Sequence, residues 1–573
     1  MEKKKQLQKS LPWFLLVLIL FFICFAMDDA LAAETPPMGP GIQIPAPTET
    51  GSLSCTIDGD NIIIQGTVAG DRSDPAYYDN YLYLFQLDSH EDGIGDRTDY
   101  TAWINRGDPV SFVLPLGFGT EEDRLFSSFV LAVFDGTSYH AISNLAYISN
   151  PEAIALNRNP YQEPFSKKGL TLDGDMLSDA MALGVANISV SMTFEQLLGE
   201  GIDFTYKGKT YHFNKETIES FDENVSACTR NNINVTAVLV NGWNDAVPAL
   251  MPSGIQRVGG ANYYMFNAST KEGAETLEAI VSFLALRYSG MDGTKGKISN
   301  WIIGNEINNQ VWNYAGPKDI TTYVQEFIKG FRICYTAIKS VNSNDHIFFS
   351  TDFYWKETNP TLLNYAARDV IDLFAQMSRE GGDMDWGLAY HPYPDPMTEP
   401  EFWDDGEVGE NGICRVTDSV DSYIVNFKNL HVLTDYFKRQ ELLKKDGGIR
   451  HIILSEQGFS SQSPERGDVE QIQAAALAYA YYIADSNPYI DSFLLHRQVD
   501  NVSETNINIA VGLWRCDMST PGVVNATGKK KAWEVYRDID KKKSLETVRF
   551  AKGIIGIGKW SDVIPGFKWK AYE

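Results

Sequence analysis

The most constraining feature of this 573-residue chain is a regular alternation that begins near Asn150. Helix-like stretches alternate there with short apolar runs rich in β-branched residues, a pattern typical of parallel βα units. Eight such runs occur, at residues 169–172, 186–191, 234–240, 301–306, 346–351, 386–391, 451–456 and 491–496. A closing helix is expected at residues 531–539. Eight βα units predict the α/β fold class and a (β/α)8 TIM barrel with enlarged loops.

A doubly wound sheet is the alternative fold for this alternation of strands and helices. It would normally carry a glycine-rich phosphate-binding turn after its first strand. No such turn follows residues 169–172, and the chain has no Walker loop, dinucleotide fingerprint or Gly-x-Ser-x-Gly elbow. The barrel is therefore favoured, and the functions that depend on those motifs have little support.

Residues 52–150 have a different pattern, in which strands and turns follow one another without a long helix. Residues 57–62 (Ile-Asp-Gly-Asp-Asn-Ile) predict a hairpin, because a tight turn separates β-branched residues. Residues 81–85, 110–114 and 129–133 are expected to be further strands. We predict an all-β sandwich domain here, followed by the barrel domain over residues 151–573. The acidic loop at residues 88–99 offers oxygen ligands for calcium but lacks the EF-hand spacing; a solvated loop is expected, and calcium binding is the alternative.

The first 33 residues have the pattern of a secretory signal peptide. Lysines at positions 3, 4, 5 and 9 precede an apolar run at residues 13–27, and small residues follow at Ala30 and Ala32. The run is shorter than the roughly 20 residues that span a bilayer, so an uncleaved anchor is the less favoured alternative. Residues 34–51, rich in Pro, Gly and Thr, are interpreted as a linker. We expect a secreted or cell-surface protein without a membrane span after signal cleavage.

The charge and the cysteines of the chain bear on its partners and its chemistry. The formal net charge of −26 at pH 7 disfavours binding to nucleic-acid phosphates and to anionic lipid. Apart from Cys24 in the signal peptide, cysteines occur at positions 55, 228, 334, 414 and 516. This odd, scattered set, without CxxC or Cys/His clusters, predicts mostly buried free thiols and no metal site. A pairing of Cys414 with Cys516 stays open.

Polar side chains crowd the carboxyl ends of the predicted strands, which is where a barrel places its active site. They are Asn305 and Glu306 at strand four, His391 and Tyr393 at strand six, Glu456 at strand seven, and His496 and Arg497 at strand eight. Carboxylates are costly to bury unless they have partners, so two Glu residues that each follow an apolar strand indicate a site. Alternation would place Glu306 on the face of Ile302, and Glu456 on the face of Leu454.

Two facing carboxyl groups at one barrel mouth are what glycoside hydrolysis requires. One of them, kept protonated, donates a proton to the leaving oxygen, while the other attacks the anomeric carbon. In a retaining enzyme the two groups lie about 5–5.5 Å apart, against about 6.5–9.5 Å when a water molecule must fit between them. The acid needs a raised pKa, which burial or the charge of the other carboxylate supplies.

These motifs resemble those of clan A, the "4/7" superfamily of retaining glycoside hydrolases on a TIM barrel. There an Asn-Glu pair ends strand four and a second Glu ends strand seven. The matching stretches here are Trp-Ile-Ile-Gly-Asn-Glu at residues 301–306 and Ile-Ile-Leu-Ser-Glu at residues 452–456. Residues 183–188 look like the passage into strand two of cellulase-like and mannanase-like members, and residues 391–393 resemble their His-x-Tyr. The resemblance covers about residues 165–539.

The resemblance implies a role for each matched position. Glu306 would be the general acid/base, Glu456 the nucleophile, and Asn305 a ligand of the sugar 2-hydroxyl. Tyr393 would hydrogen-bond the nucleophile, and His391 would line the site.

Two departures from the pattern of the clan point to a divergent family within it. Strand two ends in Ser191-Met192, where many members place an Arg near the nucleophile. Strand eight offers His496-Arg497, where a Trp platform is common, and Arg497 is a candidate to replace the missing Arg in space.

Three tryptophans are further candidates for substrate binding, because sugar rings stack on aromatic faces through their CH surfaces. Trp243, Trp312 and Trp355 follow strands three, four and five. Core or loop packing is the alternative interpretation for each.

The sequence thus predicts a secreted retaining glycoside hydrolase that acts on a poly- or oligosaccharide, with no cofactor and no metal. A non-catalytic carbohydrate-binding barrel and a transglycosylase that uses the same site are the alternatives. The β-sandwich would either bind carbohydrate or brace the barrel. Bracing is favoured, because no exposed aromatic stripe can be identified from the sequence.

Overall fold

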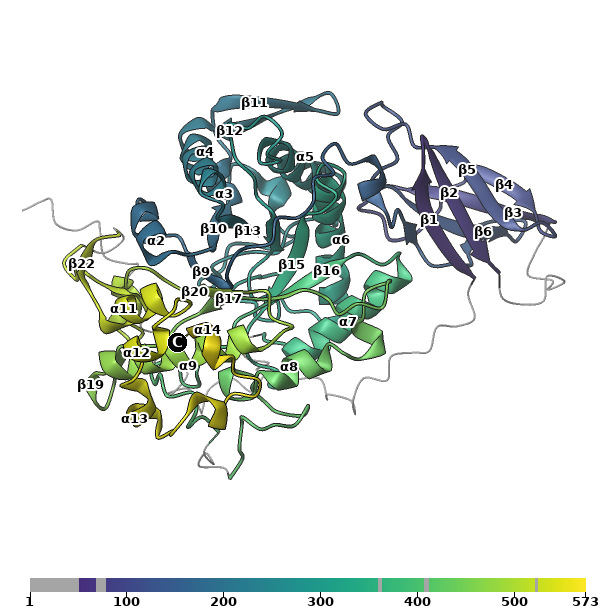
Figure 1. Ribbon diagram of the computed structural model, residues 1–573. Helices are drawn as coiled ribbons and strands as arrows, with labels where there is room; N and C mark the ends of the chain where they lie inside the picture. The colour runs from purple at the N-terminus through teal and green to yellow at the C-terminus, as the bar shows by residue number, and fades with distance from the viewer. Residues whose placement is uncertain (1–50, 69–78, 359–362, 407–411, 521–523, 573) are drawn as a thin grey trace, which may run out of the picture.

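The computed structural model describes residues 51–68, 79–358, 363–406, 412–520 and 524–572. A closed barrel of eight parallel strands forms its centre, and a smaller β-domain lies to one side (Figure 1). The predicted signal peptide and the predicted linker up to Thr50 lie outside the described residues. Within the described part of the chain, no helix combines the length and the apolar character needed to cross a membrane.

The barrel strands follow one another in chain order around the ring. They are β9 (Lys168–Thr171), β10 (Asn187–Thr193), β13 (Asn234–Val240), β14 (Asn300–Ile303), β15 (His346–Thr351), β16 (Trp386–Tyr390), β17 (Ile452–Gln457) and β20 (Ser492–Leu495). Parallel pairing of β20 with β9 closes the ring. Each strand coincides with one of the eight predicted runs, so the TIM barrel is confirmed and the doubly wound alternative is wrong.

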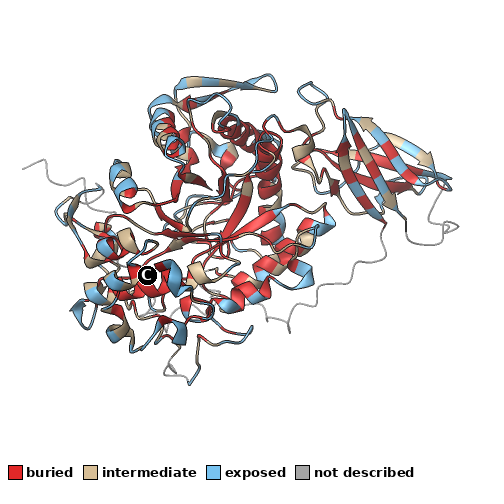
Figure 2. Cartoon of the chain, in the orientation of Figure 1, coloured by how far each residue is buried: buried red, intermediate tan, exposed pale blue. Residues whose placement is uncertain are grey.

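Helices surround the barrel, with their inner faces buried and their outer faces exposed (Figure 2). The main ones are α2 (Leu177–Leu183), α4 (Lys215–Arg230), α5 (Lys271–Arg287), α6 (Ile320–Lys339), α7 (Ala367–Glu380), α8 (His431–Tyr436), α9 (Glu470–Ser486) and α11 (Lys531–Asp538). Shorter helices are α3 (Phe194–Leu197), α10 (Val502–Thr505), α12 (Ser544–Thr547), α13 (Ala551–Ile555) and α14 (Trp569–Tyr572). α11 confirms the predicted closing helix.

Short antiparallel hairpins extend from the loops of the barrel. They are β11–β12 (Gly201–Tyr206, Lys209–Asn214), β18–β19 (Gln462–Ser463, Gly467–Asp468) and β21–β22 (Trp514–Cys516, Ala526–Lys529). The first of these turns at Lys207 and Gly208, where both residues have positive φ. β11 alternates exposed and partly buried residues, and β12 buries Tyr211 and Phe213.

Apolar side chains fill the inside and the outside of the barrel strands in alternation. Ile302, Phe348, Ala389 and Ile453 form a small cluster of their own, as expected for the filling of the lumen. Their neighbours along the strands, such as Ile303, Phe349, Leu388 and Leu454, belong to the large core between strands and helices.

β17 departs from this alternation immediately before Glu456. Leu454 pairs with Phe493 and Gln457 with Leu495, so three steps along β17 match two steps along β20. The extra residue is a β-bulge, which reverses the face presented by the residues that follow it. Regular alternation would place Glu456 with Leu454 in the outer core, so the sequence argument that the two share a face is wrong. The bulge is what turns Glu456 toward the lumen.

The N-terminal domain consists of two antiparallel sheets, which confirms the predicted all-β sandwich. One sheet has the order β1 (Ser52–Asp58), β2 (Asn61–Thr67), β5 (Val110–Pro115). The other has the order β4 (Ala102–Asn105), β3 (Tyr81–Leu87), β6 (Ser128–Phe134), β7 (Tyr139–Ala141), and β8 (Ala146–Tyr147) pairs with β6. The predicted hairpin is β1–β2, in which Asp58 pairs with Asn61.

This domain contacts the barrel at α6 and at the end of α7. The Tyr147 N–H donates to the Gly381 carbonyl at 2.9 Å, and the Arg332 guanidinium lies 4.6 Å from the Tyr147 ring centroid. On the sheet that contains β3 and β4, the rings of Tyr81, Tyr100 and Trp103 are exposed. This aromatic group cannot be identified from the sequence, because strand pairing alone brings its three residues together.

The cysteines and the acidic loop have the states that were predicted from the sequence. All five cysteines of the described part are free, and four are buried while Cys414 is partly exposed. The Cys414–Cys516 pairing is therefore not formed. In the loop at residues 88–99, Arg97 forms ion pairs with Glu91 and Asp99.

Candidate active site

Glu306 lies in a turn just beyond the end of β14. Gly304 and Glu306 have φ of +76° and +38°, and positive φ is uncommon for a residue other than glycine. The Glu306 N–H donates to the Ser350 Oγ at 2.8 Å, and the Ile307 N–H donates to the Ser350 carbonyl at 2.9 Å. The end of β15 therefore fixes a strained turn, and such strain is often found at functional sites.

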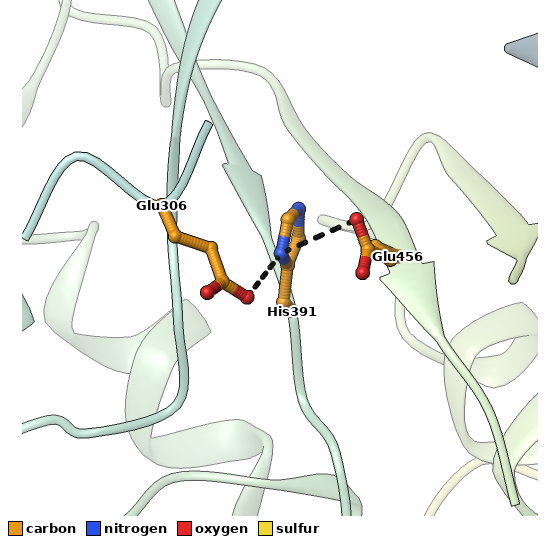
Figure 3. Close-up of side chains that lie close together, drawn as sticks. All are labelled: Glu306, His391 and Glu456. Atoms are coloured by element: carbon orange, nitrogen blue, oxygen red, sulfur yellow. Dashed lines mark hydrogen bonds and ion pairs between the residues drawn. The ribbon is translucent and has the colours of Figure 1, made fainter. Parts of the chain in front are cut away.

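His391, which follows β16 directly, lies between Glu306 and Glu456 (Figure 3). Its Nδ1 is 2.8 Å from Glu306 Oε1 and 3.9 Å from Glu456 Oε2, while its Nε2 is 2.9 Å from the Ser455 hydroxyl. The ligand atoms of these three ionisable side chains lie within 4.8 Å of one another. The two carboxylates, from the ends of β14 and β17, which β15 and β16 separate in the ring, thus face each other at one mouth of the barrel. The Tyr393 hydroxyl donates to Glu456 Oε1 at 2.9 Å.

The surroundings push the pKa values of the two carboxyl groups apart. Burial raises the pKa of Glu306, and the charge of Glu456 adds to this rise, although His391 opposes it. Burial acts on Glu456 in the same direction, but His496, His391, the Tyr393 hydroxyl and Arg497 outweigh it and lower the pKa of Glu456. One group is therefore suited to carry a proton and the other to carry a negative charge.

The pKa of His391 depends on both carboxylates. Burial lowers the pKa of His391, but the negative charge of Glu456 and the hydrogen bond to Glu306 outweigh burial and raise it above the ordinary value. An imidazolium in this position would stabilise negative charge on either neighbour.

The same three side chains are the one group in the described part of the chain that could offer three ligands to a metal ion. Zinc would need the ligand atoms at about 2.0–2.2 Å from the ion. Here His391 Nδ1 is at hydrogen-bond distance from Glu306, and the ligand atoms are spread over as much as 4.8 Å. This spacing fits proton sharing better than coordination of an ion.

Residues 160–563, which include the whole barrel and both carboxylates, match a protein family described as a family of unknown function, DUF5722. The chain belongs to DUF5722. No curated protein matches it.

Several solved structures are similar to this DUF5722 chain. A family 39 glycoside hydrolase from Bacteroides cellulosilyticus WH2 has 17% identity and a TM-score of 0.41, over 81% of this chain and 78% of that chain. A β-glycosidase from Thermosphaera aggregans has 14% identity and a TM-score of 0.40, over 63% and 82% of the two chains. A β-glucuronidase from Bacteroides uniformis has 11% identity and a TM-score of 0.36, over 85% of this chain and 50% of that chain. The DUF5722 chain thus spans about half the length of that β-glucuronidase.

The remaining predicted site residues of the DUF5722 barrel have different environments. The charge of His496 lowers the pKa of both carboxyl groups. Asn305 is partly buried beside Glu306. Arg497 lies 3.4 Å from Glu504 and 4.0 Å from Asp173, so it is engaged at the barrel rim and reaches Glu456 only through its charge.

The three candidate tryptophans differ from one another. The prediction that Trp355 binds substrate is wrong, because its ring is fully buried and packs edge-on against Tyr436. The Trp243 Nε1 donates to Asp245 at 2.7 Å, and the ring is partly exposed. Trp312 is partly exposed and lies 6.1 Å from the Tyr263 ring. Burial, followed by the charges of Glu195 and Glu456, raises the pKa of Tyr263.

Sequence reasoning missed two polar residues that contact site residues, Ser350 and Ser455, and a third, Asp352, that contacts the turn carrying Glu306. Ser350 and Asp352 belong to the end of strand five, and Ser455 precedes the predicted nucleophile. Polar residues at a strand end are a detectable signal in a barrel. Ser350 and Asp352 give that signal at strand five, where only Trp355 was predicted to belong to the site.

Replacing Ser350 with Ala should destabilise the protein by about 1–3 kcal/mol, because the buried N–H of Glu306 loses its acceptor. Chemical denaturation of the variant would measure this change. The matched control is Ser343→Ala, since the Ser343 hydroxyl is partly exposed and makes only a 3.4 Å contact with the Asn157 carbonyl. Equal stability of the two variants would contradict the proposed support of the Glu306 turn.

Proposed function

We propose that this protein is a secreted retaining glycoside hydrolase that cleaves glycosidic bonds in a poly- or oligosaccharide. The observation that carries the proposal is a pair of carboxylates, Glu306 buried and Glu456 partly exposed, with oxygen atoms within 4.8 Å of each other and pKa values shifted in opposite directions. Their separation is close to the about 5–5.5 Å of a retaining mechanism and shorter than the about 6.5–9.5 Å of an inverting one.

In the proposed reaction Glu456 attacks the anomeric carbon while Glu306 donates its proton to the glycosidic oxygen. The bond from that carbon to the leaving oxygen breaks, and a covalent ester between Glu456 and the sugar forms. Glu306, now ionised, takes a proton from water, and the water oxygen displaces Glu456 from the sugar. The hydrogen bond from Tyr393 and the charges of His391 and His496 favour the ionised Glu456 at the start and at the end of this cycle.

The test is a screen of the purified protein on aryl glycosides and polysaccharides, with the first product anomer observed by NMR. Retention of anomeric configuration is expected. Release of the inverted anomer would exclude the retaining mechanism, and binding without turnover would indicate the non-catalytic sugar-binding barrel. Adding a sugar acceptor distinguishes a transglycosylase, in which the acceptor rather than water receives the glycosyl group.

The proposal of secretion rests on the lysine-rich start, the apolar run and the small residues within positions 1–33. Expression of the full chain in a secreting host, followed by N-terminal sequencing of the exported protein, tests it. A mature chain that begins near Glu34 is expected, and retention of the first 33 residues on the membrane would contradict it.

A further inference from the structure

A third carboxyl group lies buried against the turn that carries Glu306. Asp352 is the first residue after β15, and its side chain is almost fully buried. Nδ2 of Asn308 donates to Asp352 Oδ1 at 2.6 Å, and the Asp352 N–H donates back to Asn308 Oδ1 at 3.0 Å. Nδ2 of Asn309 lies 3.4 Å from Asp352 Oδ2. Asp352 thus contacts the two residues that follow Glu306-Ile307 in the strained turn.

The hydrogen bonds that Asp352 accepts come from neutral groups. Besides the two Asn amides, the Tyr354 N–H donates to Oδ1 at 3.0 Å. These donors can support a carboxylate, but they bring no positive charge to compensate it. Burial, followed by the charge of Glu306, raises the pKa of Asp352 to about 7. Two buried carboxyl groups that interact in this way cannot both ionise cheaply, so they titrate as a pair.

We propose that Asp352 is a positioning residue for the acid step: its carboxyl group fixes the turn that carries Glu306, and because the two carboxyl groups do not ionise together, the pair keeps one proton to higher pH. This inference rests on the proposed function, because it takes Glu306 to be the acid. Three ionisable groups act on Glu306: His391 after β16, Glu456 on β17 and His496 after β20. Tyr354, Tyr390 and His391 face Asp352.

The variant Asp352→Asn tests the charge, because an Asn oxygen can still accept from Asn308 and Tyr354. Without the negative charge the proton leaves Glu306 more easily, so the high-pH limb of kcat/KM should move down by about one pH unit. Asp352→Glu, which restores the charge, should move the limb back toward the wild-type position. An unchanged limb in Asp352→Asn, with an active wild type, overturns the inference.

Asp345→Asn is the matched control. Asp345 lies just before the other end of β15, is fully buried, and also has a pKa raised to about 7, by burial. It accepts from Trp301 Nε1 at 3.1 Å and does not contact the Glu306 turn. The same substitution there should leave the high-pH limb in place. A shift of equal size would show that loss of any buried charge in this strand moves the limb, and would overturn the specific role of Asp352.

A second variant and a second measurement separate this inference from the proposed function. If Asp352→Asn does not fold, Asn308→Ala removes the shortest hydrogen bond to the carboxylate and shifts the shared proton toward Asp352, so activity should again decline at lower pH. Infrared titration of the protonated carboxyl bands needs no substrate. Because coupling is reciprocal, the Asp352 band in Glu306→Gln and the Glu306 band in Asp352→Asn should both disappear at lower pH than in the wild type.

The infrared result decides the coupling even if the wild type cleaves no glycoside. Lack of turnover by the wild type would remove the proposed function and, with it, the acid role of Glu306, while a reciprocal shift would still establish the coupled pair. Bands that titrate independently in the two variants would overturn the coupling, whatever the activity.

Discussion

Replacing Glu456 with Gln is expected to lower kcat/KM by about four orders of magnitude or more, because the amide cannot attack the anomeric carbon. Binding should change far less, since Gln has nearly the same shape and still accepts from the Tyr393 hydroxyl. Steady-state kinetics on an aryl glycoside and calorimetric binding of a sugar product would measure the two effects separately.

Glu465→Gln is the matched control for this variant, because the same chemical change then falls on an exposed side chain in the following loop. It should retain wild-type kinetics. A further readout comes from Glu456→Gly with added azide, which can enter the space left by the carboxylate and should give a glycosyl azide of inverted configuration. Substantial turnover by Glu456→Gln would remove this residue from the role of nucleophile.

The second large effect is expected for Glu306→Ala and should depend on the leaving group. A substrate whose leaving group needs protonation should lose about 10²–10⁴-fold in kcat/KM, whereas an activated aryl glycoside should form the glycosyl-enzyme nearly as fast as with the wild type. A series of aryl glycosides with increasing leaving-group pKa would show a steeper decline for the variant. Glu223→Ala, at an exposed position on α4, is the control.

Glu306→Ala also tests the pH dependence of the activity. Glu306 has to be protonated, and its raised pKa extends activity toward higher pH; activity is lost as the pH rises through that value. Glu456 has to be ionised, and its lowered pKa extends activity toward lower pH; activity is lost as the pH falls through that value. With an activated substrate, Glu306→Ala should lose the high-pH limb and keep the low-pH limb. A high-pH limb that persists would assign it to a different group.

The fold could be predicted because each barrel strand is a short apolar run between helical stretches. Residues 234–240 and 346–351 were placed with the same bounds that the structure gives. The hairpin β11–β12 was missed although its sequence alternates and contains the turn Lys207-Gly208. The hairpin lies where the barrel pattern predicts a direct passage from strand to helix. That longer pattern hides the two-residue alternation of the hairpin.

The candidate site could be predicted only in part. Glu306, His391, Tyr393 and Glu456 were expected together, and the structure brings them together. Nothing in the letters Ile-Ile-Leu-Ser-Glu-Gln shows that the strand contains an extra residue, because a bulge is defined by the partner strand. The interaction of Asp352 with Asn308 likewise depends on how two neighbouring strand ends are staggered, which local sequence does not encode.

The bulge in β17 also limits which homologous chains can be trusted to share the chemistry. Deleting Ser455 would restore a regular pleat in which Glu456 follows Leu454 directly and still faces the lumen, but the hydroxyl that contacts His391 Nε2 would be lost. Long insertions beyond Gln457 would have no such effect. A related chain whose seventh strand is shorter by that single residue can therefore conserve both glutamates in an alignment and still lack the contact that holds His391 between them.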